Sequence, residues 1–349
     1  MSRSTRRTLG SVTVQDVARA AGVSAMTVSR VMNGGTNVRE DTRKSVLAAV
    51  EKLNYRPNAA ARSLAAGGAA QIGLLYANPS ASYLSQFLIG ALETARRAGS
   101  HLVLESCEDE GEAAQAEAVR QLIDAEVRGV VLPPPLSESQ TVRAALADAG
   151  IPWAAIAMGS REAGTLNVRI DDFEAARAMT RHLIELGHRD IAFIIGHYNQ
   201  VASAERRRGF VAALEEAGID PARAAIEQGL FTYRSGLDAA ERILAGPRLP
   251  TAIFASNDDM AAAAVGVAHR RGLQVPGDIS IVGFDDTAIA TSIWPALTTI
   301  RQPIADMAEA AITMLLRRVR ERPGQTGASE EEVLPYELVV RESAGPHRG

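Results

Sequence analysis

The first sixty residues carry apolar positions at helical spacing and predict three short helices. In the first helix, the apolar residues share one face: Val14, Val17, Ala18 and Ala21. Gly22 ends this helix, because glycine takes a left-handed backbone without steric cost, and Ser24 can cap the second helix. There Val28 and Val31 face inward. The third helix is expected from about Glu40 to Asn54 on the stripe Val46, Leu47, Val50 and Leu53.

From residue 70 onward, short apolar runs alternate with amphipathic helical stretches, which predicts parallel sheets flanked by helices. The first set of runs is QIGLLYA, HLVLES, GVVLPP and WAAIAM, and the second is DIAFIIG, AAIEQG, TAIFAS and ISIVGF. A helix from Ile304 to Glu321 and a last strand, VLPYELVV, complete the chain. The predicted fold class is an all-α helix-turn-helix head followed by an α/β body of two doubly wound parallel-sheet lobes.

Charge divides the chain at the same place. The net charge of −4 over 349 residues is the sum of +7 in residues 1–67 and −11 in the remainder. A basic module on an acidic body indicates a DNA-binding head, although a solvated basic face is the alternative. The sequence has no apolar run of 18 residues and no apolar signal core behind its basic start, so we expect a cytoplasmic protein without a membrane partner. The one cysteine, Cys107, excludes an intrachain disulfide.

Catalytic signatures are missing from the sequence. It contains no GxxxxGK, HExxH or GxSxG segment, so we expect no enzyme activity and no cofactor other than a small-molecule effector. His182 and His188 are six residues apart and could bind a metal ion. The better interpretation is that GHRDIAF forms a corner between a helix and a strand, so no metal site is expected.

Two ordered segments suggest a family. DVARAAGVSAMTVSRVMN, followed by LNYRPNAAARSLA, resembles the LacI/GalR family of bacterial transcription regulators, and the likeness continues to VGFDD and PALTTIRQP. The resemblance implies a homodimeric regulator, in the first place a repressor, that binds a pseudo-palindromic double-stranded DNA operator and senses a small molecule between its lobes. A solute-binding protein without a DNA role and a doubly wound enzyme are the competing interpretations.

The resemblance also divides the chain. It implies a disordered tail (1–11), a helix-turn-helix domain (12–57), a hinge helix with linker (58–69) and an effector-binding and dimerisation domain (70–349). Lobe 1 is expected at about 70–168 and 300–330, and lobe 2 at about 169–299 and 331–342, with three crossings between them. The chain ends in SAGPHRG, where the tetrameric member of the family has a leucine-rich helix, so a dimer is expected.

The residues expected to contact DNA lie on the second helix and around the hinge: Ser24, Ala25, Met26, Thr27, Ser29, Arg30, Asn33, Tyr55, Asn58, Ala61 and Leu64. The hydroxyls suit phosphates or local caps, and Arg30 can reach a guanine edge in the major groove. Ala25 and Met26 can only touch a thymine methyl, so the operator should differ from that of the repressor for which the family is named. Leu64 matches a leucine that wedges into the minor groove, with packing against the body as the alternative.

The resemblance also implies an effector site, in the part of the family that varies with its ligand. Its candidate residues are Arg206, Phe231, Asn257, Asp285, Tyr83 and Phe87. Asn257 and Asp285 follow predicted strands, where open parallel sheets bind ligands. For Tyr83, Phe87 and Phe231 the alternative is core packing. Ala157 stands where the repressor for which the family is named has an aspartate that faces the sugar. We therefore expect a sugar or sugar derivative unlike lactose, with a purine or another small metabolite as the alternative.

Overall fold

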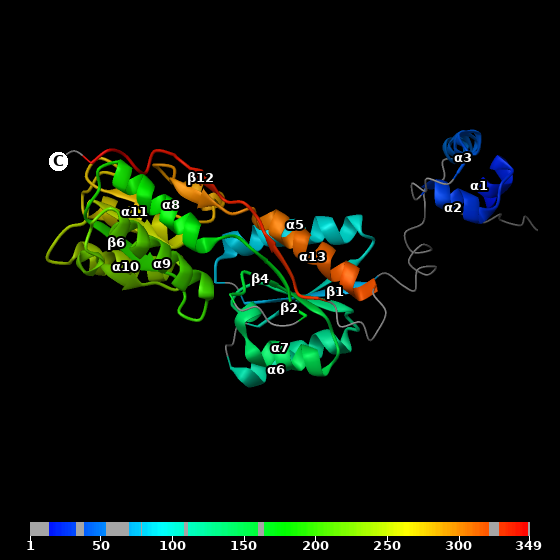
Figure 1. The fold of residues 1–349 in the computed structure, drawn as a ribbon, viewed down its shortest axis with the longest axis horizontal. Coiled ribbons are helices and arrows are strands. Elements are labelled where there is room, and N and C mark those ends of the chain that lie inside the picture. The colour runs from blue at the N-terminus through cyan, green and yellow to red at the C-terminus, as the bar shows by residue number, and fades with distance from the viewer. Residues whose placement is uncertain are drawn as a thin grey trace, which may run out of the picture. The chain divides into compact units, whose positions relative to one another are not determined.

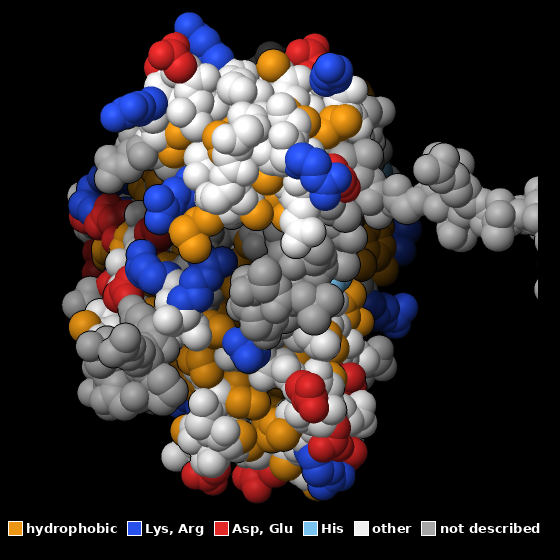
Figure 2. Space-filling model, turned by 90° about the vertical axis from the view of Figure 1, so that its right-hand side faces the viewer, with side chains coloured by type: hydrophobic (Ala, Val, Ile, Leu, Met, Phe, Trp, Pro, Cys, Tyr) orange, Lys and Arg blue, Asp and Glu red, His pale blue; other side chains and the backbone are white. Residues whose placement is uncertain are grey.

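The computed structural model describes residues 14–32, 38–53, 70–77, 79–107, 111–159, 164–320 and 328–347. These residues fall into two compact units, Met1–Ala69 and Ala70–Gly349, called here the head and the body. Within the described ranges, no helix is long and apolar enough to cross a membrane. On the face drawn in Figure 2, lysine and arginine side chains are interspersed with acidic and apolar ones, so that charges there are mixed in sign.

The head is built from the three predicted helices, α1 (Val14–Ala21), α2 (Ala25–Met32) and α3 (Glu40–Lys52). Their core is centred on the fully buried side chains of Val17, Val28 and Val46. The prediction was wrong for one residue of the apolar stripe on α3, because Leu47 is 49% exposed and Ala49 is buried instead. Val46 and Ala49 are three residues apart and share the inward face, whereas Leu47 lies about 100° further round the helix.

Lobe 1 of the body is a six-stranded parallel sheet in the order β11-β5-β4-β3-β1-β2. Its strands are β1 (Gln71–Tyr76), β2 (His101–Ser106), β3 (Gly129–Leu132), β4 (Trp153–Ile156), β5 (Leu166–Arg169) and β11 (Glu330–Val333). Helices α5 (Ala81–Arg97) and α13 (Ile304–Arg320) cover one face, and α6 (Glu112–Asp124) and α7 (Gln140–Asp148) cover the other (Figure 1). Gly90 lets α5 and α13 approach closely, since a Cβ there would lie 2.4 Å from the Ala305 carbonyl oxygen.

Lobe 2 is a four-stranded parallel sheet in the order β7-β6-β8-β9. Its strands are β6 (Ile191–Ile195), β7 (Ile226–Gln228), β8 (Ala252–Ala255) and β9 (Ser280–Val282). Helices α8 (Asp172–Glu185) and α9 (Val201–Glu216) pack together on one face, and α10 (Tyr233–Leu244) and α11 (Asp258–Arg270) pack on the other (Figure 1). The short elements are η1 (Leu136–Glu138), η2 (Pro221–Arg223) and α12 (Ala288–Ser292). His188 lies at the corner between α8 and β6, where its ring bonds the Thr251 and Ser280 hydroxyls.

Three segments join the lobes, as the resemblance implied: β5 to α8, β10 (Thr299–Arg301) to α13, and β11 to β12 (Glu337–Val339). The prediction of one continuous last strand, VLPYELVV, was wrong. Its first part belongs to β11, which pairs with β5 in lobe 1, whereas β12 pairs with β10 in antiparallel fashion. Pro335 has no amide hydrogen for a sheet and lies where the chain crosses between lobes, so lobe 2 resumes some five residues later than expected.

Candidate functional site

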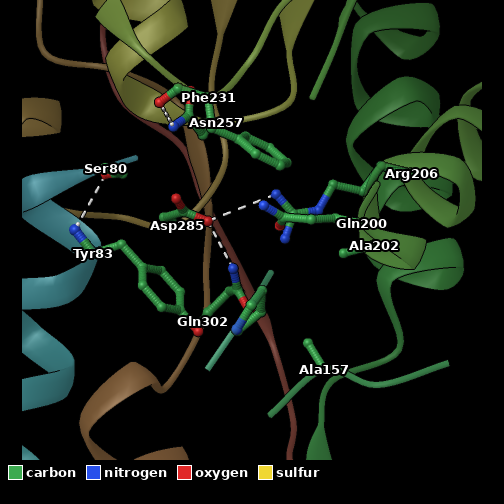
Figure 3. A pocket seen from close by; sticks show the side chains of 11 residues that line it. Ser80, Tyr83, Ala157, Gln200, Ala202, Arg206, Phe231, Asn257, Asp285 and Gln302 are labelled. Atoms are coloured by element: carbon green, nitrogen blue, oxygen red, sulfur yellow. Dashed lines mark hydrogen bonds and ion pairs between the residues drawn. The ribbon is translucent and has the colours of Figure 1, made fainter. Parts of the chain in front are cut away.

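A pocket lies between the two lobes of the body, at the carboxyl ends of their strands (Figure 3). Eleven residues line it: Ser80, Tyr83, Pro134, Ala157, Gln200, Ala202, Arg206, Phe231, Asn257, Asp285 and Gln302. Pro134 and Ala157 follow strands β3 and β4 of lobe 1, whereas Phe231, Asn257 and Asp285 follow strands β7, β8 and β9 of lobe 2. The pocket therefore occupies the edge at which open parallel sheets bind ligands, and it draws on both sheets.

Arg206 is the central cation of this pocket, and protein groups already hold its guanidinium. Its Nε donates to Asp172 at 2.8 Å and its Nη1 donates to the Ser256 carbonyl at 2.5 Å. The same Nη1 lies 3.7 Å from an Asp285 oxygen. The guanidinium stacks on Phe284, 3.6 Å from the ring centroid. From inside the pocket, Arg206 thus links α8 to the ends of β8 and β9. A ligand can reach only the edge of its guanidinium that these groups leave open.

Two buried carboxylates, Asp172 and Asp285, lie beside this arginine, and a third, Asp258, is buried in the first turn of α11. Burial raises the pKa of Asp285 to about 7, although Arg206 and a hydrogen bond from Gln302 lower it. Burial also raises the pKa of Asp258, and the nearby charge of Asp285 adds to that effect. The pKa of the Asp172 carboxyl is raised by burial and lowered by Arg206. Among the lining residues that the structure describes there is no second lysine, arginine or histidine, and this lining favours neutral hydroxyl and amide groups over anions.

The pKa of Asp285 predicts that the body loses stability as pH rises through 7. Because the folded-state pKa is raised, the folded protein binds more protons than the unfolded chain between pH 4 and 7. The free energy of unfolding should therefore fall by about 2 kcal/mol between pH 5 and pH 8. Urea denaturation at both pH values would measure this loss. In Asp285→Asn the loss should become smaller, and the part that remains is expected from Asp172 and Asp258, whose pKa values burial also raises. A slope unchanged by that substitution would assign the titration to another group.

Strained backbone is concentrated at the same place. Among the described residues, five that are not glycine have a positive φ, and four of them belong to the pocket or adjoin it: Ala157 (56°), Phe231 (61°), Asp285 (113°) and Asp286 (57°). Gly196 accommodates the Phe231 ring, since a Cβ there would lie 2.0 Å from it. Such conformations each cost about 1–3 kcal/mol and accumulate at functional sites. The strain is therefore evidence for function that is independent of the polar lining.

The structure brings most of the predicted effector residues together, with two differences. Phe87 does not line the pocket; it is fully buried behind Tyr83, with ring centroids 6.5 Å apart, which is the core packing weighed as its alternative. Asn257 lines the pocket, but both ends of its amide are used. Its Oδ1 accepts from the Met260 amide at the start of α11, and its Nδ2 donates to the Phe231 carbonyl.

Sequence reasoning missed Ser80, Gln200 and Gln302. Gln302 belongs to the segment PALTTIRQP and directly follows β10, so its position at a strand end was a usable signal. Ser80 follows β1 by four residues and caps α5, accepting a hydrogen bond from the Tyr83 amide. Gln200 is the N-cap residue of α9 and is buried, and its side-chain Nε2 has no hydrogen-bond partner in the structure.

On the head, α2 presents an exposed face. Met26 is 66% exposed, and Arg30 extends along it with Nη2 3.7 Å from the thioether sulfur. Ser24 accepts a hydrogen bond from the Thr27 amide, and the two hydroxyls lie 2.9 Å apart, so the local cap considered for Ser24 is present. Ala25 is half-buried and packs against the core of the head, so its predicted place on the exposed face was wrong. The remaining DNA contacts predicted from the sequence lie outside what the structure describes: the Ser29 side chain, Asn33, Tyr55, Asn58, Ala61 and Leu64.

Comparison with known proteins identifies the family. Residues 13–58 match the model for bacterial regulatory proteins of the lacI family, and residues 180–344 match a periplasmic binding protein-like domain. The chain is 33% identical to catabolite control protein A of Priestia megaterium over 95% of its length and 99% of that protein. It is also 36% identical to the transcriptional repressor PurR of Shigella dysenteriae, over 96% of this chain and 98% of that protein. The chain belongs to the LacI family.

Solved structures agree with this assignment to the LacI family. A lac repressor dimer bound to operator and the anti-inducer ONPF aligns with a TM-score of 0.72 and 31% identity, covering 96% of this chain and 100% of that one. The regulator CelR in complex with cellobiose aligns with a TM-score of 0.71 and 31% identity, covering 95% of this chain and 100% of that one. Membership of the LacI family confirms the predicted fold class and the predicted role as a DNA-binding transcription regulator under effector control.

Proposed function

We propose that this chain represses transcription in the cytoplasm, as a homodimer on a pseudo-palindromic operator, and that a neutral polyhydroxyl molecule, a sugar or sugar derivative, binds the cleft and changes operator affinity. The observation that carries the proposal is one chain holding both a helix-turn-helix head and a cleft lined from two lobes. The ligand must bind the two conformations of the body with different affinity, since equal affinity would shift neither population.

The lining of the pocket supports a neutral ligand. Arg206, the one arginine among the described lining residues, is already neutralised by Asp172 and faces Asp285, so a phosphate or carboxylate would meet excess negative charge there. Asp285 and Gln200 offer an acceptor and a donor that suit hydroxyl groups. The similar structure of CelR is a complex with cellobiose, a neutral sugar of this kind. A purine is the second candidate, because the Phe231 ring in the pocket provides a stacking face for a planar heterocycle.

The head supplies the sequence readout. Arg30 is an exposed side chain of α2 that can donate two hydrogen bonds to guanine, and the exposed apolar side chain of Met26 suits a thymine methyl. Ser24 and Thr27 are placed at the helix start, where hydroxyls and backbone amides meet phosphates. Asn33, Tyr55, Asn58, Ala61 and Leu64 remain predicted backbone and minor-groove contacts.

Arg30→Ala should weaken operator binding by about 1–3 kcal/mol and relax the preference at one base pair of each half-site, because one arginine–guanine contact is lost. Binding to random DNA should change much less. Fluorescence anisotropy with the operator and with each substituted half-site would measure both effects. Arg207→Ala, an exposed arginine of the body, is the matched control. An equal loss on operator and random DNA would make Arg30 a phosphate contact instead.

The proposed function itself can be tested in two steps. Selection from random DNA should yield a pseudo-palindromic operator whose affinity falls steeply with salt, because counterions are released from phosphates. A thermal-shift screen of neutral sugars, sugar phosphates and purines should then find a ligand among the neutral sugars, and that ligand should change operator affinity. Stabilisation by sugar phosphates alone would refute the neutral-sugar assignment, and failure to select any operator would refute the regulatory one.

A further inference from the structure

The two lobes lie close together at the pocket. The cavity between its lining residues measures about 30 Å³. That space suits ordered water, whereas small-molecule pockets usually measure several hundred Å³. A ligand of the size of a sugar can enter only after the lobes or the lining side chains move. The contacts that join the lobes across the cleft therefore decide how often the site is open.

One cross-lobe contact stands out by its geometry. Ser80, at the start of α5 in lobe 1, donates its hydroxyl to Asp259 Oδ2 at 2.5 Å, and Asp259 lies in the first turn of α11 in lobe 2. The two residues are 179 positions apart in the sequence. Hydrogen bonds to an ionised carboxylate are shorter and stronger than those between neutral groups. A serine hydroxyl in lobe 1 can therefore form no stronger hydrogen bond to a side chain of lobe 2.

Other features place this bond at a rigid point. Ser80 is buried, and its oxygen also accepts the Tyr83 amide hydrogen, which fixes the hydroxyl at the start of α5. Nearby, Gln86 donates to the Asp286 carbonyl at 3.3 Å, again from lobe 1 to lobe 2. On another side of the cleft, Val201 packs directly on Gly159, where a Cβ would lie 2.3 Å from the valine Cγ1. The lobes thus meet in several direct contacts around the cleft.

We propose that the Ser80–Asp259 hydrogen bond is a latch that holds the two lobes together at the cleft, so that the cleft widens enough for the effector to enter and leave only when this bond breaks. The proposal rests on the cleft being the effector site. When the cleft opens, water binds both side chains and replaces their mutual hydrogen bond. The free-energy difference between the closed and open states is therefore small enough for them to exchange. The latch therefore sets the fraction of binding-competent molecules, and with it the apparent affinity for the effector.

Solvent access to the pocket can be measured without any effector. In a Cys107→Ala background, Ala202→Cys places a thiol in the lining of the cleft, where iodoacetamide can reach it only when the cleft opens. Asp259→Ala and Ser80→Ala should each raise the alkylation rate by about tenfold or more, the factor expected for one charged hydrogen bond. Asp259→Asn retains an acceptor and should give an intermediate rate. Ser85→Ala, an exposed serine of α5, is the matched control.

A second measurement separates opening from local unfolding. Spin labels on Arg120→Cys in α6 and Arg234→Cys in α10, diluted with unlabelled chain, report the distance between the lobes. Asp259→Ala should add a longer distance, while thermal denaturation remains cooperative. Equal alkylation rates in Asp259→Ala and its parent, or an unchanged distance distribution, would overturn the latch. Because neither assay contains a ligand, a failed latch leaves the effector proposal standing, and a failed effector screen leaves the latch measurable.

Discussion

Replacement of Arg206 by alanine should lower the free energy of unfolding of the body by about 3–5 kcal/mol, because two buried carboxylates lose their cation. Asp172 would be left with no partner for its 2.8 Å ion pair, and Asp285 would lose the charge 3.7 Å away. Protonation offers these groups a neutral state, so the loss should be smaller at pH 5 than at pH 8. Denaturant titration at both pH values, followed by thermal shift with the identified effector, would measure stability and response together.

The neighbouring arginine provides a close control. Arg207 lies on the same helix with an exposed side chain, so Arg207→Ala should change the stability of the body by less than about 0.5 kcal/mol. The double variant Arg206→Met with Asp172→Leu should regain much of the lost stability, since an apolar pair can replace a buried ion pair, yet remain unresponsive to effector. Full stability of Arg206→Ala alone would contradict the assignment of this residue as a cross-link.

Val28→Asp should abolish specific operator binding while leaving the body intact. Val28 is fully buried in the head, and a carboxylate there costs more than about 4 kcal/mol. A module of this size has only a few kcal/mol of stability at about 0.05–0.15 kcal/mol per residue, so the head should unfold. Operator affinity should then fall by about 10³-fold or more, to the non-specific level or below. Anisotropy titration and calorimetry would report the two units separately.

An exposed leucine of the head is the control for this experiment. Leu47→Gln changes a residue that is 49% exposed on α3 and should retain operator binding within a few-fold. In Val28→Asp the melting transition of residues 70–349 should be unchanged, because these residues form a separate compact unit. A body that melts earlier in Val28→Asp would show that the two units depend on each other for stability.

The architecture was predictable from the sequence because periodicity reports it directly. Helical stripes located α1 to α3, and alternating apolar runs located β1 to β4 and β6 to β9, whereas no run was assigned to β5. The errors arose where two neighbouring residues are both apolar or where one segment serves two lobes. Val46 and Leu47 are adjacent, and pattern alone could not decide which faces the core. VLPYELVV contains Pro335, whose missing amide hydrogen marks the break that the structure shows between β11 and β12.

The candidate site was predictable only in part, because its residues meet through topology. Asn257 and Asp285 follow strands and could be placed at the ligand edge by that rule alone. Tyr83 and Phe87 are four residues apart on one apolar stripe, yet Tyr83 lines the pocket and Phe87 lies behind it. The contact between Ser80 and Asp259 joins residues 179 positions apart, and no local pattern announces it.

The left-handed residues of the cleft have a consequence for how this protein could be made more robust. Glycine adopts such backbone without strain, so Ala157→Gly would exchange about 1–3 kcal/mol of strain for about 0.4–1 kcal/mol of added chain entropy. This gain in stability would alter a residue of the pocket lining, where the shape of the pocket determines which ligand binds. Selection for heat resistance alone would therefore favour changes in the cleft that blunt ligand discrimination, so durability and sensitivity compete at the same few positions.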